Sequence, residues 1–298
     1  MRRGTYSIVA RDGATGELGV AVQSHWFSVG SVVPWARAGV GAVATQSVVE
    51  PAYGPRLLAR LEAGEAIEAA LEELLAEDEA SRFRQVGAID AAGTVACHTG
   101  EGCIRHAGDV AGEGFSAQAN MMAASGVPEA LAAGFDAAEG SLPRRLLEAL
   151  MAAETAGGDV RGRQSAALLV APASGEGWKR ACELRVEDHD DPLGELARLL
   201  GLHEAYDRAT EGDDLAGEGR HAEAGERYRE AAALAPGNHE LLFWSGLAMV
   251  QAGEREDGLA RVREAIALQP GWAELLPRLS DEIAPSAEAV CDALGLSR

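Results

Sequence analysis

Residues 5–22 read TYSIVARDGATGELGVAV, and this stretch decides the fold of the first part of the chain. Apolar and polar residues alternate from Thr5 to Ala10, which is the period of a β-strand. Residues 12–16 (DGATG) have the composition of a turn, and residues 18–22 form a second apolar run. Two such runs joined by a short Gly-containing loop predict a β-hairpin.

Beyond this hairpin, strand patterns and helix patterns follow one another in blocks. Apolar residues recur at helical spacing from Leu57 to Leu75, and Gly64 separates two helices there. Further helices are expected over residues 127–138 and 142–156, and further strands over residues 31–36, 40–46, 85–90, 94–98, 165–170 and 181–186. This order favours a layered α+β domain over a doubly wound parallel sheet. No Gly-x-Gly-x-x-Gly or phosphate-binding loop with Lys is present, so those kinds of nucleotide site have no support.

The C-terminal part of the chain contains an internal repeat of 34 residues. The charged, proline-ended segment 187–192 is expected to link it to the first domain, with a helix over about 193–206. Residues 234–237 (LAPG) match residues 268–271 (LQPG), and the offset is 34 (270 − 236), the length of a tetratricopeptide repeat. We therefore expect two domains, residues 1–190 and residues 191–298. The repeats would either bind a protein partner or serve as a helical extension that packs on the first domain or forms a dimer.

The charge and composition of the chain exclude several classes of function. It carries 26 Lys and Arg against 47 Asp and Glu, a net charge of −21, which disfavours binding to nucleic acid. The four cysteines, of which only Cys97 and Cys103 are close in sequence, do not form a disulfide framework and suit reduced thiols in a cytoplasmic protein. We expect no signal peptide and no membrane-spanning segment. We also expect a homo-oligomer. Trp26, Phe27 and Trp35 suit hydrophobic packing or subunit contacts better than a ligand site.

Several segments resemble, in order, those of the bacterial and archaeal domain of unknown function 1028 family. They are residues 5–12 (TYSIVARD), 33–46 (VPWARAGVGAVATQ), 52–55 (AYGP), 84–87 (RQVG), 98–100 (HTG) and 157–168 (GGDVRGRQSAAL). This family is grouped with the N-terminal nucleophile (Ntn) hydrolases. The resemblance covers about residues 5–187. It implies a four-layer αββα Ntn-hydrolase-like sandwich, here followed by an all-α tetratricopeptide-like domain, and an amidohydrolase or peptidase ancestry.

Ntn chemistry would make Thr5 the catalytic nucleophile. In such enzymes the first residue attacks an amide carbonyl while its own α-amine acts as the base, so no residue can precede it. Here Arg2, Arg3 and Gly4 precede Thr5, and these residues would have to be removed first, for example by self-cleavage at the Gly4–Thr5 bond. The alternative is that Thr5 is an ordinary β-branched strand residue. Ser7, on the same strand face, is a second candidate.

The resemblance also implies further site residues. Gln118 and Asn120 are expected to donate hydrogen bonds to a developing oxyanion, or else to satisfy loop backbone groups. Arg161 could bind a substrate carboxylate with help from Asp159, or the two could form an ion pair that holds a loop. The remaining expected substrate-binding residues are Ser24, Gln46, His98 and Gln164.

We expect neither a metal nor a cofactor. Cys97, His98, Cys103 and His106 make only one compact group, and Cys97 and His98 would point to opposite faces of one strand. Two functions remain open at this stage. One is an Ntn-type hydrolase acting on a small-molecule or peptide amide, with a substrate that carries a carboxylate. The other is a non-catalytic ligand-binding or oligomerising scaffold whose repeats bind a protein partner.

Overall fold

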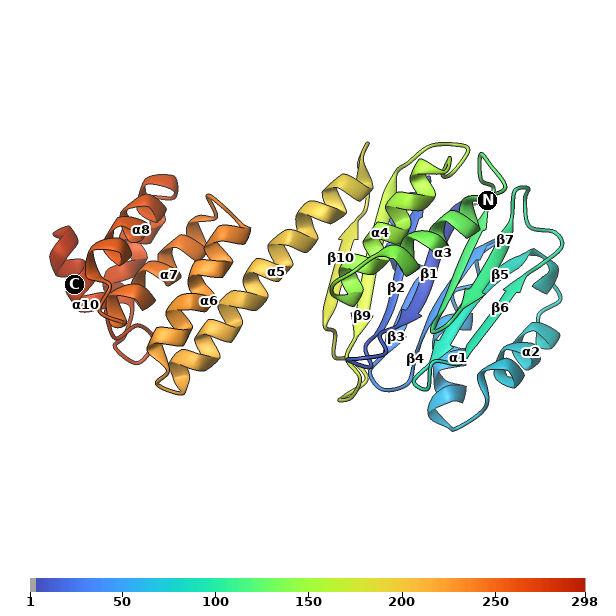
Figure 1. The fold of residues 1–298 in the computed structure, drawn as a ribbon, viewed down its shortest axis with the longest axis horizontal. Coiled ribbons are helices and arrows are strands. Elements are labelled where there is room, and N and C mark those ends of the chain that lie inside the picture. Colours follow the sequence, from blue (N-terminus) through green and yellow to red (C-terminus); the bar gives the residue numbers. More distant parts are fainter. Residues whose placement is uncertain (1–3, 298) are drawn as a thin grey trace. The chain divides into compact units, whose positions relative to one another are not determined.

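The computed structural model describes residues 4–297 and divides the chain into two compact units. The first unit is residues 1–200, a mixed α+β domain with antiparallel sheets, and the second is residues 201–298, which is helical. Figure 1 shows both units and labels their elements. No helix among residues 4–297 combines the length and the apolar character needed to cross a membrane.

A six-stranded antiparallel sheet forms one half of the first unit. Its strand order is β10-β9-β2-β1-β8-β7, so the predicted hairpin of β1 and β2 lies at its centre. The strands are β1 (Thr5–Arg11), β2 (Leu18–Ser24), β7 (Gly108–Gly112), β8 (Phe115–Asn120), β9 (Ser165–Ala171) and β10 (Cys182–Val186). Helices α3 (Val127–Ala137) and α4 (Leu142–Thr155) pack on one face of this sheet, as Figure 1 shows.

A four-stranded antiparallel sheet forms the other half, in the order β3-β4-β5-β6. Its strands are β3 (Pro34–Arg37), β4 (Gly41–Ser47), β5 (Arg84–Asp90) and β6 (Val95–Thr99). Helices α1 (Tyr53–Glu62) and α2 (Ile67–Glu77) cover its outer face. Each of the four sheet-covering helices buries an apolar stripe, which explains why helical periodicity identified them.

The two sheets pack against each other through their inner faces. Along β1, the side chains alternate between the α3–α4 side, where Tyr6 and Ile8 lie, and the inter-sheet side, where Val9 lies. Val9 packs there in an apolar cluster that also contains Val20 and Ile89. Thr5 and Ser7 share the parity of Val9, so the first residues of β1 point polar groups between the sheets.

Two local predictions differ from the structure. In place of one strand over residues 31–36, there is a short 3-10 helix, η1 (Val29–Ser31), followed by β3. The hairpin of β7 and β8 was not predicted, because β7 reads GDVAG and lacks an apolar alternation. It is nonetheless paired along its length with β8, which is buried. Its strand character comes from pairing with a neighbour and not from its own composition.

The second unit consists of consecutive helices. They are the end of α5 (Pro192–Gly217), α6 (His221–Leu234), α7 (His239–Gln251), α8 (Arg255–Leu268), α9 (Gly271–Leu275) and α10 (Ala287–Leu294), with a 3-10 turn η3 (Leu276–Arg278) before the last. Helices α6 and α8 begin 34 residues apart (255 − 221) and also end 34 residues apart (268 − 234). Ala231 and Ala265, one repeat apart, are both buried. The sequence period therefore appears as a repeated helix length and burial pattern.

Helix α5 is longer than the predicted helix and belongs to both units. Its first residues, including Leu193, Leu196 and Leu200, are buried in the same cluster as α4 and the six-stranded sheet. The compact units accordingly divide after Leu200, whereas the sequence placed the domain boundary at residue 190. The apolar side chains at the start of α5 are the reason for this difference.

Candidate functional site

The first residue of β1 lies between two polar neighbours. In the strand register, Thr5 is opposite Ser24 of β2 on one side and opposite Asn120 of β8 on the other. Because directly opposite residues in antiparallel strands project to the same face, all three side chains point toward the second sheet. The Thr5 hydroxyl donates a hydrogen bond to Ser24 Oγ at 3.1 Å. Three residues expected at the site are thus brought together by strand pairing.

A layer of buried amides continues from this point between the sheets. Ser7 Oγ donates to Gln46 Oε1 and accepts from Gln118 Nε2, each at 2.7 Å. Gln46 Nε2 and Asn120 Nδ2 both donate to Gln85 Oε1, at 2.8 and 3.0 Å. All of these side chains are at most 1% exposed. Buried amides and hydroxyls are tolerated only when paired in this way, so the layer is held in one arrangement.

Gly87 of β5 makes room for one of these amides. A Cβ atom at Gly87 would overlap Gln118 Oε1, although the two residues belong to different sheets. The absence of a side chain at Gly87 therefore leaves room between the sheets for the Gln118 amide, which donates to Ser7 on the neighbouring strand of its own sheet. This explains a glycine in the middle of a strand, where it otherwise weakens the sheet.

The carbonyl group of Gly4 is held by two hydrogen-bond donors. Ser24 Oγ donates to its oxygen at 2.5 Å, and Arg161 Nη2 donates to the same oxygen at 2.9 Å. This is the carbonyl of the Gly4–Thr5 peptide bond, and the Thr5 hydroxyl is itself bonded to Ser24. Two donors on one carbonyl oxygen next to a hydroxyl are the elements of an acyl-transfer site, because they can stabilise negative charge that develops on that oxygen.

The Asp159 carboxylate holds the Arg161 guanidinium in place. Its carboxylate is fully buried and forms a two-bond pair with the guanidinium, at 3.1 Å from Nε and 2.7 Å from Nη2. The backbone N–H groups of His25 and Arg161 also donate to the Asp159 carboxylate, at 3.2 and 2.9 Å. These charge-assisted bonds fix the guanidinium in position. In this structure Arg161 engages Asp159 and the carbonyl oxygen of Gly4.

Asp159 also limits the space around Gly4. A Cβ atom at residue 4 would lie 2.7 and 2.8 Å from the two carboxylate oxygens of Asp159. Only a residue without a side chain fits in this place unless the carboxylate moves. Thr5 is 1% exposed, so the candidate site is closed while Gly4 occupies it. The expected leader residues Arg2 and Arg3 lie outside the described residues.

Two of the expected site residues are not part of this cluster. His98 lies on the outer face of β6, and its imidazole Nε2 is 3.0 Å from the backbone oxygen of Ser81. Gln164 follows the Asp159 loop, but its side-chain amide donates to Asp188 at 3.0 Å. Neither residue touches the polar layer, because strand alternation turns His98 away from it and the loop turns Gln164 outward.

The cysteine and histidine residues show no metal-binding arrangement. Cys97 Sγ donates to Asp109 Oδ2 at 3.0 Å, and burial together with this carboxylate raises the pKa of the Cys97 thiol to about 12. Burial also raises the pKa of Cys103. Thiols that stay protonated are poor metal ligands. Within residues 4–297, no group of three or more His, Cys, Asp or Glu side chains could hold a metal ion.

Sequence reasoning missed Gln85 as a member of the site. Gln85 accepts from two amides and donates to the backbone oxygen of Ala119 at 2.9 Å, so it joins the two sheets. The signal was present in the strand 85–90, where Gln85 and Gly87 fall on the same face as Ile89. A polar residue and a glycine on the buried face of an apolar strand indicate a special environment.

These features define an α+β domain whose two antiparallel sheets enclose a buried polar layer next to the first residue of the central strand. The chain belongs to the family of unknown function DUF1028, whose family model matches residues 5–196. A crystal structure of a Silicibacter pomeroyi protein, described with the same family model, is 32% identical, with a TM-score of 0.61. That match covers 66% of this chain and 88% of the other.

A second structure matches more weakly. It is Anbu (ancestral beta-subunit) from Yersinia bercovieri, with 11% identity and a TM-score of 0.34, and the match covers 66% of this chain and 93% of the other. No curated protein matches the chain.

Proposed function

We propose that this chain is an amide hydrolase of the N-terminal nucleophile type, with Thr5 as its nucleophile. The observation that carries the proposal is the hydrogen bonding of the Gly4 carbonyl oxygen by Ser24 and Arg161, directly beside the Thr5 hydroxyl. Such a carbonyl is polarised and its developing charge is stabilised, which is the main requirement for acyl transfer. An ordinary strand start has no need of two side-chain donors on one carbonyl.

The first reaction of this site is release of the residues before Thr5. Thr5 Oγ1 bonds to the carbonyl carbon of Gly4, the C–N bond to Thr5 breaks, and the hydroxyl proton passes to the departing nitrogen. The resulting ester is then hydrolysed by water, which leaves a carboxylate on Gly4 and a free α-amine on Thr5. An α-amine with a pKa of about 8 can then accept the hydroxyl proton of Thr5 in later turnovers.

In these later turnovers the substrate acyl group takes the place of Gly4. Ser24 and Arg161 then donate to the substrate carbonyl, while Gln118 and Asn120, together with Gln46, position β1 through their hydrogen bonds. Because Asp159 leaves no room for a Cβ atom there, the acyl group is a glycyl or other unbranched group. Gln118 and Asn120 are thus positioning residues in this proposal, and the oxyanion donors are Ser24 and Arg161.

The finer description of the fold belongs to the same proposal. A helix pair on the outer face of each of two packed sheets supports an αββα Ntn-hydrolase-like sandwich. In the second unit, the 34-residue offset of α6 and α8 supports a tetratricopeptide-like repeat. A protein partner for the repeats and a homo-oligomer are further parts of this proposal.

Intact-mass spectrometry of the purified full chain tests the proposal. The wild-type chain is expected to lose the residues before Thr5 on incubation, whereas Thr5→Ala keeps them and Thr5→Ser retains release. The released form is then assayed on glycyl and alanyl amides of aminomethylcoumarin, and only the glycyl amide is expected to be cleaved. A wild-type chain that stays intact across pH 5–9, or a released wild-type chain that cleaves the glycyl and alanyl amides at equal rates, contradicts the proposal.

A second function is favoured by one observation, the burial of Thr5. A residue that is 1% exposed and whose hydroxyl is already bonded to Ser24 suits a structural role in a non-catalytic, ligand-binding or oligomerising scaffold. The same mass measurement separates the two functions, because a scaffold would keep its leader in the wild-type chain as well as in Thr5→Ala.

A further inference from the structure

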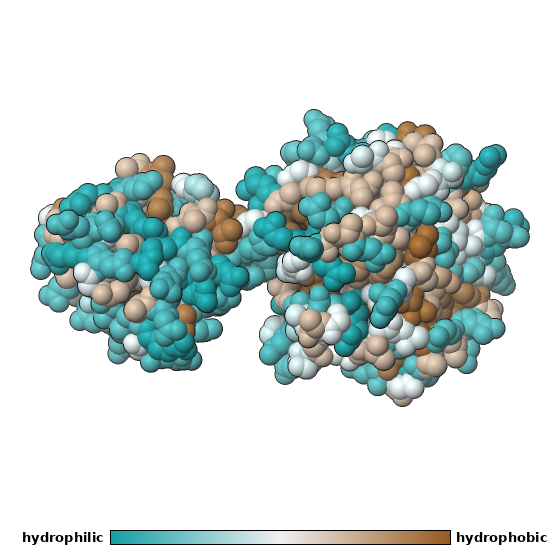
Figure 2. Space-filling view, viewed as in Figure 1, coloured by the Kyte–Doolittle hydropathy of each residue, from teal (hydrophilic) through white to brown (hydrophobic). Residues whose placement is uncertain are grey.

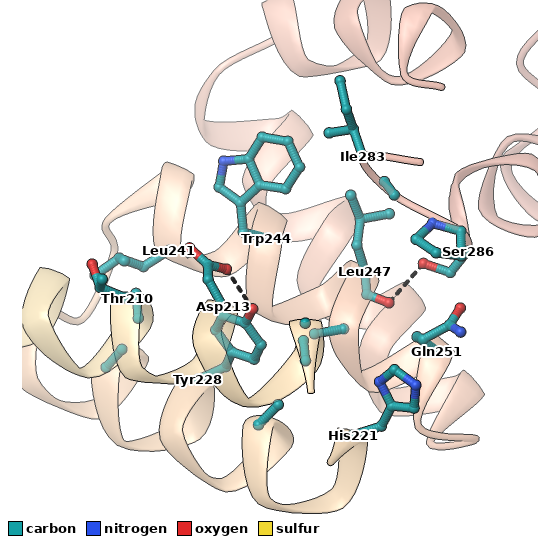
Figure 3. Close-up of a pocket in the computed structure, with 18 of the residues that line it drawn as sticks. Thr210, Asp213, His221, Tyr228, Leu241, Trp244, Leu247, Gln251, Ile283 and Ser286 are labelled. Carbon is teal, nitrogen blue, oxygen red and sulfur yellow. Dashed lines mark hydrogen bonds between the residues drawn. The ribbon is translucent and has the colours of Figure 1, made fainter. Parts of the chain in front are cut away.

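The second unit contains a cavity that the proposed hydrolase site does not use. Its volume is about 580 Å³, and residues of α5, α6, α7 and the segment 282–286 line it. Figure 3 shows the contributions of these elements, with Asp213 from α5, Tyr228 from α6, Trp244 and Leu247 from α7, and Ile283 from the connecting segment. A volume of this size accommodates one or two large side chains of a bound ligand.

The walls of the cavity are largely apolar. Leu241 and Leu247 of α7 are buried, and Trp244 between them is half-buried. Ile283 is 66% exposed at the rim, which is unusual for an isoleucine. On the face that Figure 2 shows, the surface of this unit is mostly hydrophilic, with apolar residues in small groups. Concentrated apolar surface in a concave site is a feature of binding sites.

The rim of the cavity carries negative charge. Asp213, Glu240 and Glu282 line it, and no Lys or Arg is among the residues that do. The Tyr228 hydroxyl donates to Asp213 at 2.5 Å, and the Tyr206 hydroxyl donates to Glu240 at 2.6 Å. Asp213 and Glu240 are therefore held in place, and their carboxylates still have acceptor capacity. A cation at the mouth of the cavity would find fixed partners there.

The segment that closes one side of the cavity is fixed. Ser286 Oγ donates to the backbone oxygen of Leu247 at 2.7 Å, and Ser286 is buried. Figure 3 shows this bond beside the cavity. The bond holds the segment with Ile283 against α7, so the cavity is preformed, and a ligand does not need to order this segment when it binds.

We propose that this cavity binds a basic peptide segment of a partner protein, with an apolar or aromatic side chain inserted next to Trp244 and Leu247 and flanking Lys or Arg residues paired with Asp213, Glu240 and Glu282. Charge complementarity selects this occupant, because no Lys or Arg is among the lining residues beside the three rim carboxylates. A second copy of the chain is a poor occupant, since its net charge is −21. The proposal is independent of whether Thr5 is a nucleophile.

A randomised nonapeptide library displayed on phage, selected against the full chain, tests the proposal. The selected peptides are expected to carry a Leu, Ile, Phe or Trp flanked by Lys or Arg. A synthetic peptide of the selected sequence is then measured by fluorescence anisotropy. The affinity of the chain for this peptide is expected to fall about tenfold in the triple variant Asp213→Asn, Glu240→Gln and Glu282→Gln. The affinity of the wild-type chain is expected to fall with added salt.

The matched control is the combination of Glu226→Gln, Asp257→Asn and Glu264→Gln, which removes three exposed carboxylates of the same unit outside the cavity. The affinity of this control variant for the peptide is expected to stay within about twofold of wild type. Ile283→Ala, at the exposed rim, tests the apolar part and is also expected to weaken binding. Selection of acidic or purely apolar peptides, of no peptide, or of peptides that bind both triple variants equally overturns the proposal.

Discussion

Arg161 donates a hydrogen bond to the carbonyl oxygen of Gly4 at 2.9 Å, across 157 residues of sequence. The same guanidinium is paired with Asp159, which is buried and also borders the Cα atom of Gly4. One loop, between α4 and β9, thus contributes both the donor that polarises the Gly4–Thr5 bond and the carboxylate that shapes the space around it. This contact connects the start of β1 to a segment of the site that is far from it in sequence.

Arg161→Met combined with Asp159→Asn is expected to slow release of the residues before Thr5 by about 10²–10³-fold, because one of two donors to the developing oxyanion is lost. Changing both residues avoids leaving an unpaired buried carboxylate. The rate is followed by intact-mass spectrometry. Arg163→Ala is the control, since Arg163 pairs with Asp191 and does not contact Gly4. Equal rates in wild type and the double variant would remove Arg161 from the proposed mechanism.

Gly87→Ala is expected to destabilise the first unit by about 1–3 kcal/mol, because its Cβ atom would overlap Gln118 Oε1 and displace that amide from Ser7. Urea denaturation followed by circular dichroism measures the change. Gly13→Ala is the control, since a Cβ atom at Gly13 meets nothing within 4 Å. If both variants unfold at the same urea concentration, Gln118 does not depend on the space at Gly87.

Asp78→Asn is expected to lower stability by about 1–2 kcal/mol at pH 7 and by less near pH 3. Hydrogen bonds from Arg84, and then from the backbone of Ala80 and the hydroxyl of Tyr53, lower the pKa of Asp78 below its usual 3.8. A depressed pKa stabilises the folded state above about pH 3.8, and this stabilisation is lost as the pH falls through the folded-state value. Thermal melts at both pH values measure it.

Asp136→Asn is the control for this pH dependence, because Asp136 is exposed on α3. It is expected to change the melting temperature little at either pH. A destabilisation by Asp78→Asn that is as large at pH 3 as at pH 7 would show that the ionised carboxylate is not the stabilising group.

Gly246→Ala is expected to destabilise the second unit by about 1–3 kcal/mol. A Cβ atom there would lie 2.7 Å from a methyl group of Val262 and 2.8 Å from the backbone oxygen of Gly258, so α7 and α8 would have to separate. Gly225→Ala in α6 is the opposite case, because its Cβ atom has room and alanine favours a helix. That variant is expected to gain up to about 1 kcal/mol. Thermal melts of the full chain measure both changes. A melting temperature that shifts in the same direction for Gly246→Ala and Gly225→Ala would contradict this packing.

The sequence predicted the elements whose signal is local. The β1–β2 hairpin followed from alternation and a Gly-containing turn, and helices α1 to α4 followed from their apolar stripes. The 34-residue period anticipated the matching bounds of α6 and α8. Edge strand β7 was missed, since a five-residue GDVAG strand has no periodicity of its own. The extension of α5 to Gly217 was also missed, although Gly219, with a positive φ just after the helix, is a local signal for its end.

The sequence by itself also determined that polar residues would occur on buried strand faces, because Thr5, Gln46 and Gln118 interrupt otherwise apolar runs. Only the tertiary structure decided which of them meet. Strand register placed Ser24 and Asn120 beside Thr5. It also placed Gln85 opposite Gln46 and turned His98 to the other face of its sheet. The reason is physical: periodicity is fixed by near neighbours in the chain. The contact of Arg161 with Gly4, in contrast, depends on the packing of segments that the chain itself separates widely.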